Sequence, residues 1–183
     1  MIEELILVTG MPGSGKSIVK EVAEGLGIPV LTMGDVIRGE VKRRGLKEEV
    51  RSYVFVMKDI RRRFGAQIVA KRVGKKLTNI KAKTVCIEGV RSLEEVEYFR
   101  RVAKEVHILA LVSSFKIRLE RLSSRNRLGD LKTEMELEER DKTELKVGMG
   151  DVIAKADYYL LNDERPIDDF RRDIRRAIIR FIQ

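Results

Sequence analysis

The chain has 183 residues, of which 43% are hydrophobic and 37% are charged. This length suits one α/β domain with a buried core, and the hydrophobic content excludes a disordered chain. The formal net charge of +9 is compatible with binding polyphosphates or nucleic acid. Only 5% of the residues are aromatic, so stacking platforms for single-stranded nucleic acid are scarce and a phosphate site is favoured.

Two further features bear on the location of the protein. No apolar run approaches the roughly 20 residues that span a membrane, and the first run leads into a phosphate-binding motif instead of forming a signal peptide. The single cysteine, Cys86, lies in an apolar run and excludes an internal disulfide or a cysteine-based zinc cluster. We therefore expect a cytoplasmic protein with one structural thiol.

The motif that dominates the sequence is Gly-Met-Pro-Gly-Ser-Gly-Lys-Ser, which fits the P-loop pattern G-x-x-x-x-G-K-[ST] at every fixed position. An apolar run before it indicates a buried strand, and a helical pattern follows it. Glycines permit a tight turn whose N–H groups face an anion. Lys16 can contact the β- and γ-phosphates, and Ser17 can offer its hydroxyl to Mg²⁺. The predicted nucleotide-binding residues are Gly10, Met11, Pro12, Gly13, Ser14, Gly15, Lys16 and Ser17.

Short apolar runs alternate with helical patterns along the rest of the chain. Strands are expected at about 4–9, 29–33, 84–88, 106–112 and 158–161, and helices at about 16–26, 35–44, 47–64, 66–77, 115–124, 131–146 and 167–181, with another after Ser92. This alternation predicts an α/β fold of the P-loop NTPase type, with a five-stranded parallel sheet covered by helices on both faces. We expect a single domain over residues 1–183, with helical inserts at 35–65 and 125–146 as its most mobile parts.

Ligands of such sheets gather at the carboxyl ends of the strands, where several charged residues are expected. Glu88 ends a buried strand and can orient the water shell of Mg²⁺, or it only caps the next turn. Asp35 is either the N-cap of its helix or a group that faces the reacting phosphate as a base. Arg38 and Arg91 stand at neighbouring strand ends and together could clamp one phosphate.

A second set of arginines surrounds a polar, glycine-containing loop. Arg118, Arg121 and Arg125 recur at about helical spacing before the loop, and Arg140 follows on the next helix. Such runs are often only solvated faces, but here they also suit a lid that neutralises a transferring phosphate. His107, at the start of a strand, is expected to be structural.

These motifs resemble the nucleoside-monophosphate kinase branch of P-loop proteins, which includes adenylate kinase and dephospho-CoA kinase. The chain is most similar to the archaeal group of adenylate-kinase-related proteins. Gly-Asp-Val-Ile-Arg at 34–38 is similar to the Gly-Asp-Leu-Leu-Arg of adenylate kinases, and Glu-Gly-Val-Arg at 88–91 to their Asp-Gly-Phe-Pro-Arg. The resemblance implies that 35–65 is an acceptor-binding insert in which Arg38, together with Arg91, holds the phosphate of the acceptor.

The resemblance also assigns the arginines of a short lid at 125–146. Arg121 and Arg125 match the arginines that precede the lid, and Arg140 matches the one that leaves it. This implies that Arg121 lies near the donor base and that Arg125 and Arg140 close over the γ-phosphate. Asn162 matches the asparagine that lies near the donor base in dephospho-CoA kinases. The chain departs from adenylate kinases in its short lid without zinc cysteines, in Glu88 for aspartate, and in lacking both the proline before Arg91 and a clear counterpart of the glutamine that reads AMP.

The sequence thus predicts an ATP- and Mg²⁺-dependent kinase that acts on a nucleotide or nucleotide-like acceptor bearing a phosphate. The residues expected to carry catalysis are Lys16, Asp35, Arg125 and Arg140, with Ser17 and Glu88 at the metal. The alternative is a regulatory ATPase of the same fold that acts on RNA or on a ribosomal or other protein partner. A kinase needs the acceptor clamp of Arg38 and Arg91, whereas a regulatory ATPase does not. A nucleotide-binding protein without turnover is a third hypothesis, which the intact P-loop and lid arginines disfavour.

Overall fold

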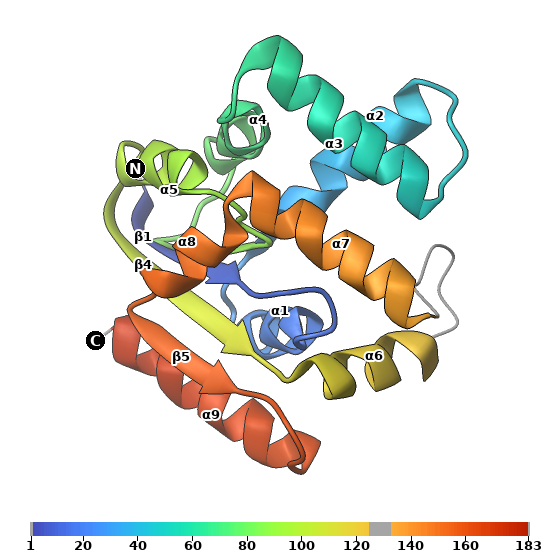
Figure 1. Cartoon of the computed structure of the whole chain (residues 1–183). Coiled ribbons are helices and arrows are strands. Elements are labelled where there is room, and N and C mark those ends of the chain that lie inside the picture. The colour runs from blue at the N-terminus through green and yellow to red at the C-terminus, as the bar shows by residue number, and fades with distance from the viewer. Residues whose placement is uncertain (1, 125–132, 183) are drawn as a thin grey trace.

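The computed structural model describes residues 2–124 and 133–182. Strands and helices alternate along the chain, as Figure 1 shows. The strands are β1 (Ile2–Thr9), β2 (Val30–Thr32), β3 (Thr84–Glu88), β4 (Ala103–Val112) and β5 (Tyr158–Leu161). The helices are α1 (Lys16–Gly25), α2 (Met33–Arg43), α3 (Val50–Phe64), α4 (Ile68–Leu77), α5 (Leu93–Arg100), α6 (Phe115–Ser124), α7 (Glu134–Val147), α8 (Met149–Ala154) and α9 (Ile167–Phe181).

The five strands form one parallel sheet in the order β2-β3-β1-β4-β5. The central strand β1 is buried on both faces, and its side chains alternate between two cores. Ile6 and Val8 pack with α1 and α9, whereas Leu5 and Leu7 pack with α2, α3, α4, α5 and α8. The predicted five-stranded P-loop architecture is therefore confirmed, and β1 delivers its carboxyl end directly to the glycine-rich loop.

Several element boundaries differ from those expected from the sequence. Strand β4 begins at Ala103, and α7 begins after Thr133, whose hydroxyl forms a capping box with Glu136. Helix α8 was not expected at all, because Gly148 and Gly150 suggested an irregular break. Gly148 does end α7 in a left-handed conformation, with φ of 113°, but the chain then turns into a short helix that packs Val152 on the core.

Helix α2 is attached to its neighbours by buried ion pairs. Glu40, which is only 5% exposed, accepts hydrogen bonds from Arg43, Arg44 and Arg72. The hydrogen bond from Arg43, with those from Arg44 and Arg72, lowers the pKa of Glu40 to about 2. Arg44 also donates to Asp59 of α3 at 2.8 Å. These contacts connect α2 with both α3 and α4.

Two side chains are structural, as expected. Cys86 is buried in β3, and burial raises the pKa of its thiol. The ring of His107 stacks on Phe181 of α9, with the ring centroids 4.7 Å apart. No helix in the described part of the chain is long and apolar enough to cross a membrane.

Candidate active site

The loop between β1 and α1 has the backbone of an anion-binding turn. Gly10, Gly13 and Gly15 have φ values of 146°, 83° and 100°, a region that other residues rarely adopt. A Cβ atom on Gly10 would lie 2.5 Å from the carbonyl oxygen of Leu111, and one on Gly15 would collide with Asn162. The glycines are therefore required by backbone conformation and by close packing alike.

Lys16 begins α1 and folds back over this loop. Its Nζ donates to the carbonyl oxygens of Gly10 at 2.6 Å and Met11 at 3.0 Å. Burial lowers the pKa of Lys16 to about 8, and the nearby carboxylate of Glu88 opposes this shift. A phosphate held by the loop would lie beside this ammonium group and favour its protonated form.

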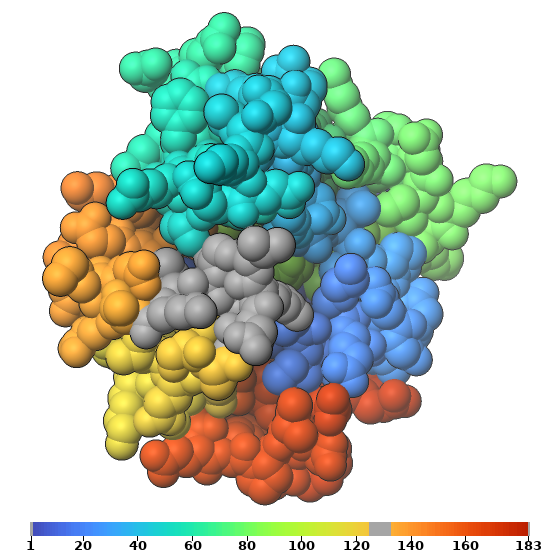
Figure 2. All heavy atoms as spheres, turned by 90° about the vertical axis from the view of Figure 1, so that its right-hand side faces the viewer, coloured from blue at the N-terminus to red at the C-terminus, as the bar shows by residue number. Residues whose placement is uncertain are grey.

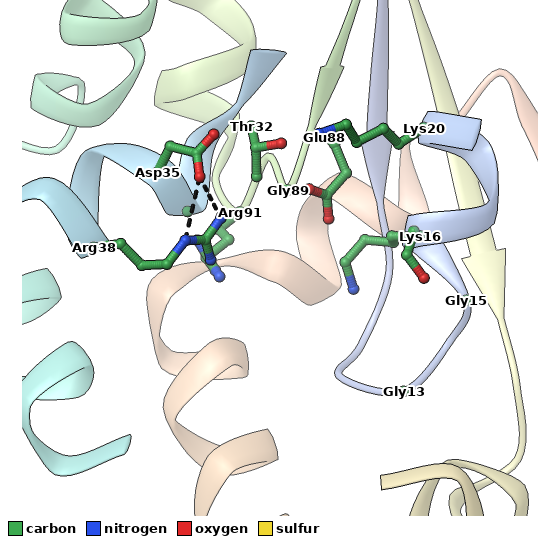
Figure 3. A pocket seen from close by; sticks show the side chains of 12 residues that line it. Gly13, Gly15, Lys16, Lys20, Thr32, Asp35, Arg38, Glu88, Gly89 and Arg91 are labelled. Carbon is green, nitrogen blue, oxygen red and sulfur yellow. Dashed lines mark hydrogen bonds and ion pairs between the residues drawn. The ribbon is translucent and has the colours of Figure 1, made fainter. Parts of the chain in front are cut away.

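A pocket of about 390 Å³ opens in front of the loop. Figure 3 shows Lys16 and Glu88 pointing into this space, with Asp35 and Arg38 on the opposite wall. Ser17 also lines it, so a hydroxyl and a carboxylate, ligand types that suit Mg²⁺, face the same pocket. The described residues contain no group of three or more His, Cys, Asp or Glu side chains that could hold a metal. The donor set thus fits an ion that takes its remaining ligands from phosphate and water, as Mg²⁺ commonly does.

Asp35 is not the N-cap of its helix. Helix α2 begins at Met33, so Asp35 lies inside the first turn, while the residue at the N-cap position is Thr32. The Asp35 carboxylate instead accepts a hydrogen bond from Arg38 Nε at 3.2 Å, and a second from Nη2 of the same guanidinium. Both side chains are 52% exposed at the edge of the pocket. The N-cap interpretation is therefore wrong, and the geometry shows that Asp35 orients Arg38.

Arg91 follows β3 and is fixed through its backbone. Its N–H donates to the carboxylate of Glu95 at 2.9 Å, and Glu95 also accepts from Arg61 Nη2 at 2.6 Å. Ser92 caps α5 as expected, because its hydroxyl accepts from the backbone N–H of Glu95. Ser92 and Glu95 do not form a complete capping box, because the Glu95 carboxylate accepts from Arg91 and Arg61 instead of from the backbone N–H of Ser92.

The side chain of Arg91 is fixed by a residue that sequence reasoning missed. Glu144 of α7 is 1% exposed and accepts from Arg91 Nε at 2.7 Å, while its other oxygen lies 2.6 Å from Arg140 Nη2. The only sequence signal was the four-residue spacing between Arg140 and Glu144 on one helix. Arg38, Arg91 and Arg140 line a second cavity of about 100 Å³. The structure therefore brings together Arg38 and Arg91, which are predicted to hold the acceptor, and Arg140, which is predicted to belong to the lid.

Arg118 is also more than a solvated charge. It is 5% exposed, donates to the carbonyl oxygen of Pro12 at 3.1 Å, and forms a two-point contact with Asp141 at 2.6 and 2.9 Å. Asp141 belongs to α7, so this pair connects α6 and α7 to the P-loop. The recurrence of arginines in α6 gave no indication of which one is buried.

Arg121 and Asn162 lie together on the other side of the P-loop. Arg121 Nη1 donates to the carbonyl oxygen of Asn162 at 2.9 Å, and Asn162 Nδ2 donates to the carbonyl oxygen of Ser14 at 2.9 Å. The two residues expected near the donor base are thus adjacent to each other and to the loop. Arg125 and the start of the expected lid lie outside the described residues. Figure 2 shows α1, α2, α3, α6 and α7 arranged around the face on this side of the molecule.

Comparison with known proteins agrees with this arrangement. Residues 9–138 match a family model described as an AAA domain. The UPF0200 protein PYRAB09750 of Pyrococcus abyssi is 45% identical over 182 residues, which cover 97% of this chain and 96% of that protein. A UPF0200 protein of Hyperthermus butylicus is 41% identical over 176 residues, which cover 96% and 94%.

Solved structures share the fold at low sequence identity. The TT1252 protein of Thermus thermophilus superposes with a TM-score of 0.68 at 20% identity, covering 98% of each chain. A shikimate kinase from Acinetobacter baumannii in complex with shikimate gives 0.58 at 19%, covering 98% of this chain and 94% of that one. A gluconokinase from Sinorhizobium meliloti 1021 gives 0.59 at 18%, covering 98% and 93%. The relatives and the family model therefore show that the chain belongs to the UPF0200 family and contains an AAA domain, and the solved structures show that it shares their fold.

Proposed function

We propose that this protein is an ATP-dependent phosphotransferase that moves the γ-phosphate to a small acceptor bearing a phosphate, a nucleotide or a nucleotide-like molecule. The observation that carries this proposal is the continuity of two sites. The P-loop pocket and the arginine cavity share Gly34, Arg38 and Arg91 in their walls. A triphosphate on the loop and an anion on the arginines would therefore face each other.

On the donor side, the loop N–H groups and Lys16 would hold the β- and γ-phosphates. Ser17 and Glu88 would hold Mg²⁺, which supplies charge neutralisation between the phosphates. Arg121 and Asn162 would lie near the donor base, because they stand beside the loop at the end of β5. The protein would act by positioning and by neutralising charge, which is most of what phosphoryl transfer requires.

On the acceptor side, Arg38 and Arg91 would grip the acceptor phosphate, and Arg140, which lines the same cavity, would contact both that phosphate and the transferring group. A phosphate monoester is already largely ionised at neutral pH, since its second pKa is about 6. Such an acceptor needs no general base, so Asp35 would serve catalysis by orienting Arg38. Residues 35–65 would form the acceptor insert, and 125–146, with Arg125, the lid of a single domain spanning residues 1–183.

The names of two structural neighbours, shikimate kinase and gluconokinase, support transfer to a small molecule. A kinase of this kind needs a donor site beside an acceptor site, and the two adjoining pockets of this chain would supply them. Because ATP is a cytoplasmic metabolite, we place the reaction in the cytoplasm.

The test is a panel of phosphate-bearing metabolites, scored by ADP release over the rate without acceptor. At least one nucleotide or nucleotide-like acceptor should raise the rate well above that background. No transfer to any member, with ATP hydrolysis stimulated by RNA or by a ribosomal protein partner, would contradict the proposal and favour a regulatory ATPase.

A further inference from the structure

One buried carboxylate lies among three of the cationic groups of the site. Glu144 Oε2 accepts from Arg91 Nε at 2.7 Å, and Glu144 Oε1 lies 2.6 Å from Arg140 Nη2. Burial alone would raise the pKa of Glu144, but Arg91, Arg140 and Lys16 hold it below its usual range. The carboxylate therefore remains ionised, and each of its oxygens holds one guanidinium.

The charges in this cluster do not balance. Arg91 and Arg140 carry two positive charges, and Glu144 is the carboxylate between them. Three other acids act on these arginines, but Glu95 pairs with Arg61, Asp141 pairs with Arg118, and Glu88 acts on Lys16 as well as on Arg91. Arg91 Nη1 is also buried and has no hydrogen-bond partner among the described residues. A buried guanidinium N–H without a partner is costly unless something accepts from it. The cluster therefore lacks one anion, and both arginines line the small cavity in which such an anion would fit.

We propose that Glu144 is a positioning residue that holds Arg91 and Arg140 so that their remaining N–H groups converge on one acceptor phosphate. This inference deepens the proposed function and rests on it for the identity of the anion. Glu144 would not touch the substrate. It would act by fixing two long side chains before the anion binds. Without Glu144, these side chains would lose their rotamer freedom on binding, and that entropy cost would weaken the affinity for the anion.

Two substitutions separate the geometry of Glu144 from its charge. Glu144→Asp keeps the charge but is one methylene shorter, so it cannot reach both arginines. Glu144→Gln keeps the length but removes the charge. Glu138→Gln is the matched control, because Glu138 lies on the same helix, is half exposed and pairs with Lys142 at 3.8 Å. A thermal melt of each variant reports whether the fold is kept.

The readouts use binding and need no turnover. The first is the affinity for orthophosphate of the protein saturated with Mg²⁺ and the non-hydrolysable analogue AMP-PNP, which occupies the P-loop. The second is the affinity for AMP-PNP without orthophosphate. Glu144→Asp should weaken orthophosphate binding roughly tenfold and leave the AMP-PNP affinity unchanged. Glu144→Gln should also weaken orthophosphate binding roughly tenfold without changing the AMP-PNP affinity, because its amide NH₂ cannot accept from a guanidinium. Glu138→Gln should match the wild type in both.

Each outcome decides the inference. Unchanged orthophosphate affinity in either Glu144→Asp or Glu144→Gln would overturn it. Equal weakening of orthophosphate and AMP-PNP in Glu144→Asp, with a lower melting temperature, would show a structural role only. Failure of the proposed function would be seen in a different experiment, the acceptor panel, if the wild-type protein transfers phosphate to none of its members. The binding readouts stand whichever way that panel turns out.

Discussion

The proposed donor side and the proposed acceptor side of this site are built in different ways. The donor side is mostly backbone: a loop with three glycines of positive φ leads into the N-terminus of α1, where backbone N–H groups can bind an anion. The acceptor side is mostly side chain, with Arg38 from α2, Arg91 from the loop after β3, and Arg140 from α7. Each of these arginines is ion-paired with a carboxylate, Asp35 or Glu144.

The two sides should therefore respond differently to substitution. A site built from backbone should lose function when one of its glycines or its single lysine is substituted. It should tolerate substitutions of the side chains around it. A side-chain site depends on every ion pair that orients it, since a buried charge that loses its partner is costly.

The largest effect is expected from Lys16→Ala. Lys16 supplies the only side-chain cation of the loop itself, so its loss should lower ATP turnover about 100- to 1000-fold, as removal of a preorganised donor does. Steady-state ADP release with Mg-ATP measures this. Lys76→Ala, an exposed lysine of α4, is the control. Near wild-type turnover in Lys16→Ala would mean that the P-loop pocket is not the donor site.

A smaller and more selective effect is expected from Arg91→Ala. The loss of a charge-assisted contact of about 1.5–3 kcal/mol predicts roughly 10- to 150-fold slower transfer. Hydrolysis without acceptor should hardly change, because it needs only the donor side. Arg91→Lys should rescue poorly, since lysine cannot contact two phosphate oxygens in one plane. Arg100→Ala on α5 is the control. Equal loss of ATP affinity, hydrolysis and transfer would place Arg91 in the donor site.

These two sides also differ in how far the sequence predicts them. The donor loop is contiguous in the sequence, so local patterns predict its motif and the strand and helix on either side. The alternation of strands and helices predicts the parallel sheet. The acceptor side joins segments about 50 residues apart, and nothing local distinguishes Glu144 from the other acids of α7. The same holds for Arg118, whose burial depends on its contact with Pro12 and Asp141. Local patterns predict elements, whereas long-range ion pairs need the fold.

Asn162→Ala tests whether the donor side is as dependent on backbone as we infer. This substitution removes a neutral hydrogen bond to the carbonyl oxygen of Ser14, worth about 0.5–1.5 kcal/mol, and the longer bond at 3.2 Å that Asn162 Oδ1 accepts from Arg121 Nη2. We expect nucleotide affinity to fall only roughly two- to tenfold, with a slightly lower melting temperature. Calorimetric titration with AMP-PNP measures the affinity, with Asn79→Ala as the control. A loss as large as that of Lys16→Ala would show that the loop depends on this side chain.

A change of pH should act on the two sides differently, with no effect on AMP-PNP affinity below pH 8. Arginines keep their charge throughout the accessible range, whereas the pKa of Lys16 is about 8. AMP-PNP affinity should therefore be full below pH 8 and fall up to about tenfold per unit above it, until the nucleotide-bound pKa is reached.

Stability of the free protein should respond with the opposite sign. Because unfolding returns Lys16 to its ordinary pKa of 10.5, the unfolded chain binds more protons between pH 8 and 10.5, and this group makes the fold more stable as pH rises there. Titrations and melts of the wild type and of Lys16→Ala, at matched pH values, measure both trends. If the wild type and Lys16→Ala show the same pH profiles, Lys16 does not titrate in this range and the difference between the two sides is not one of charge state.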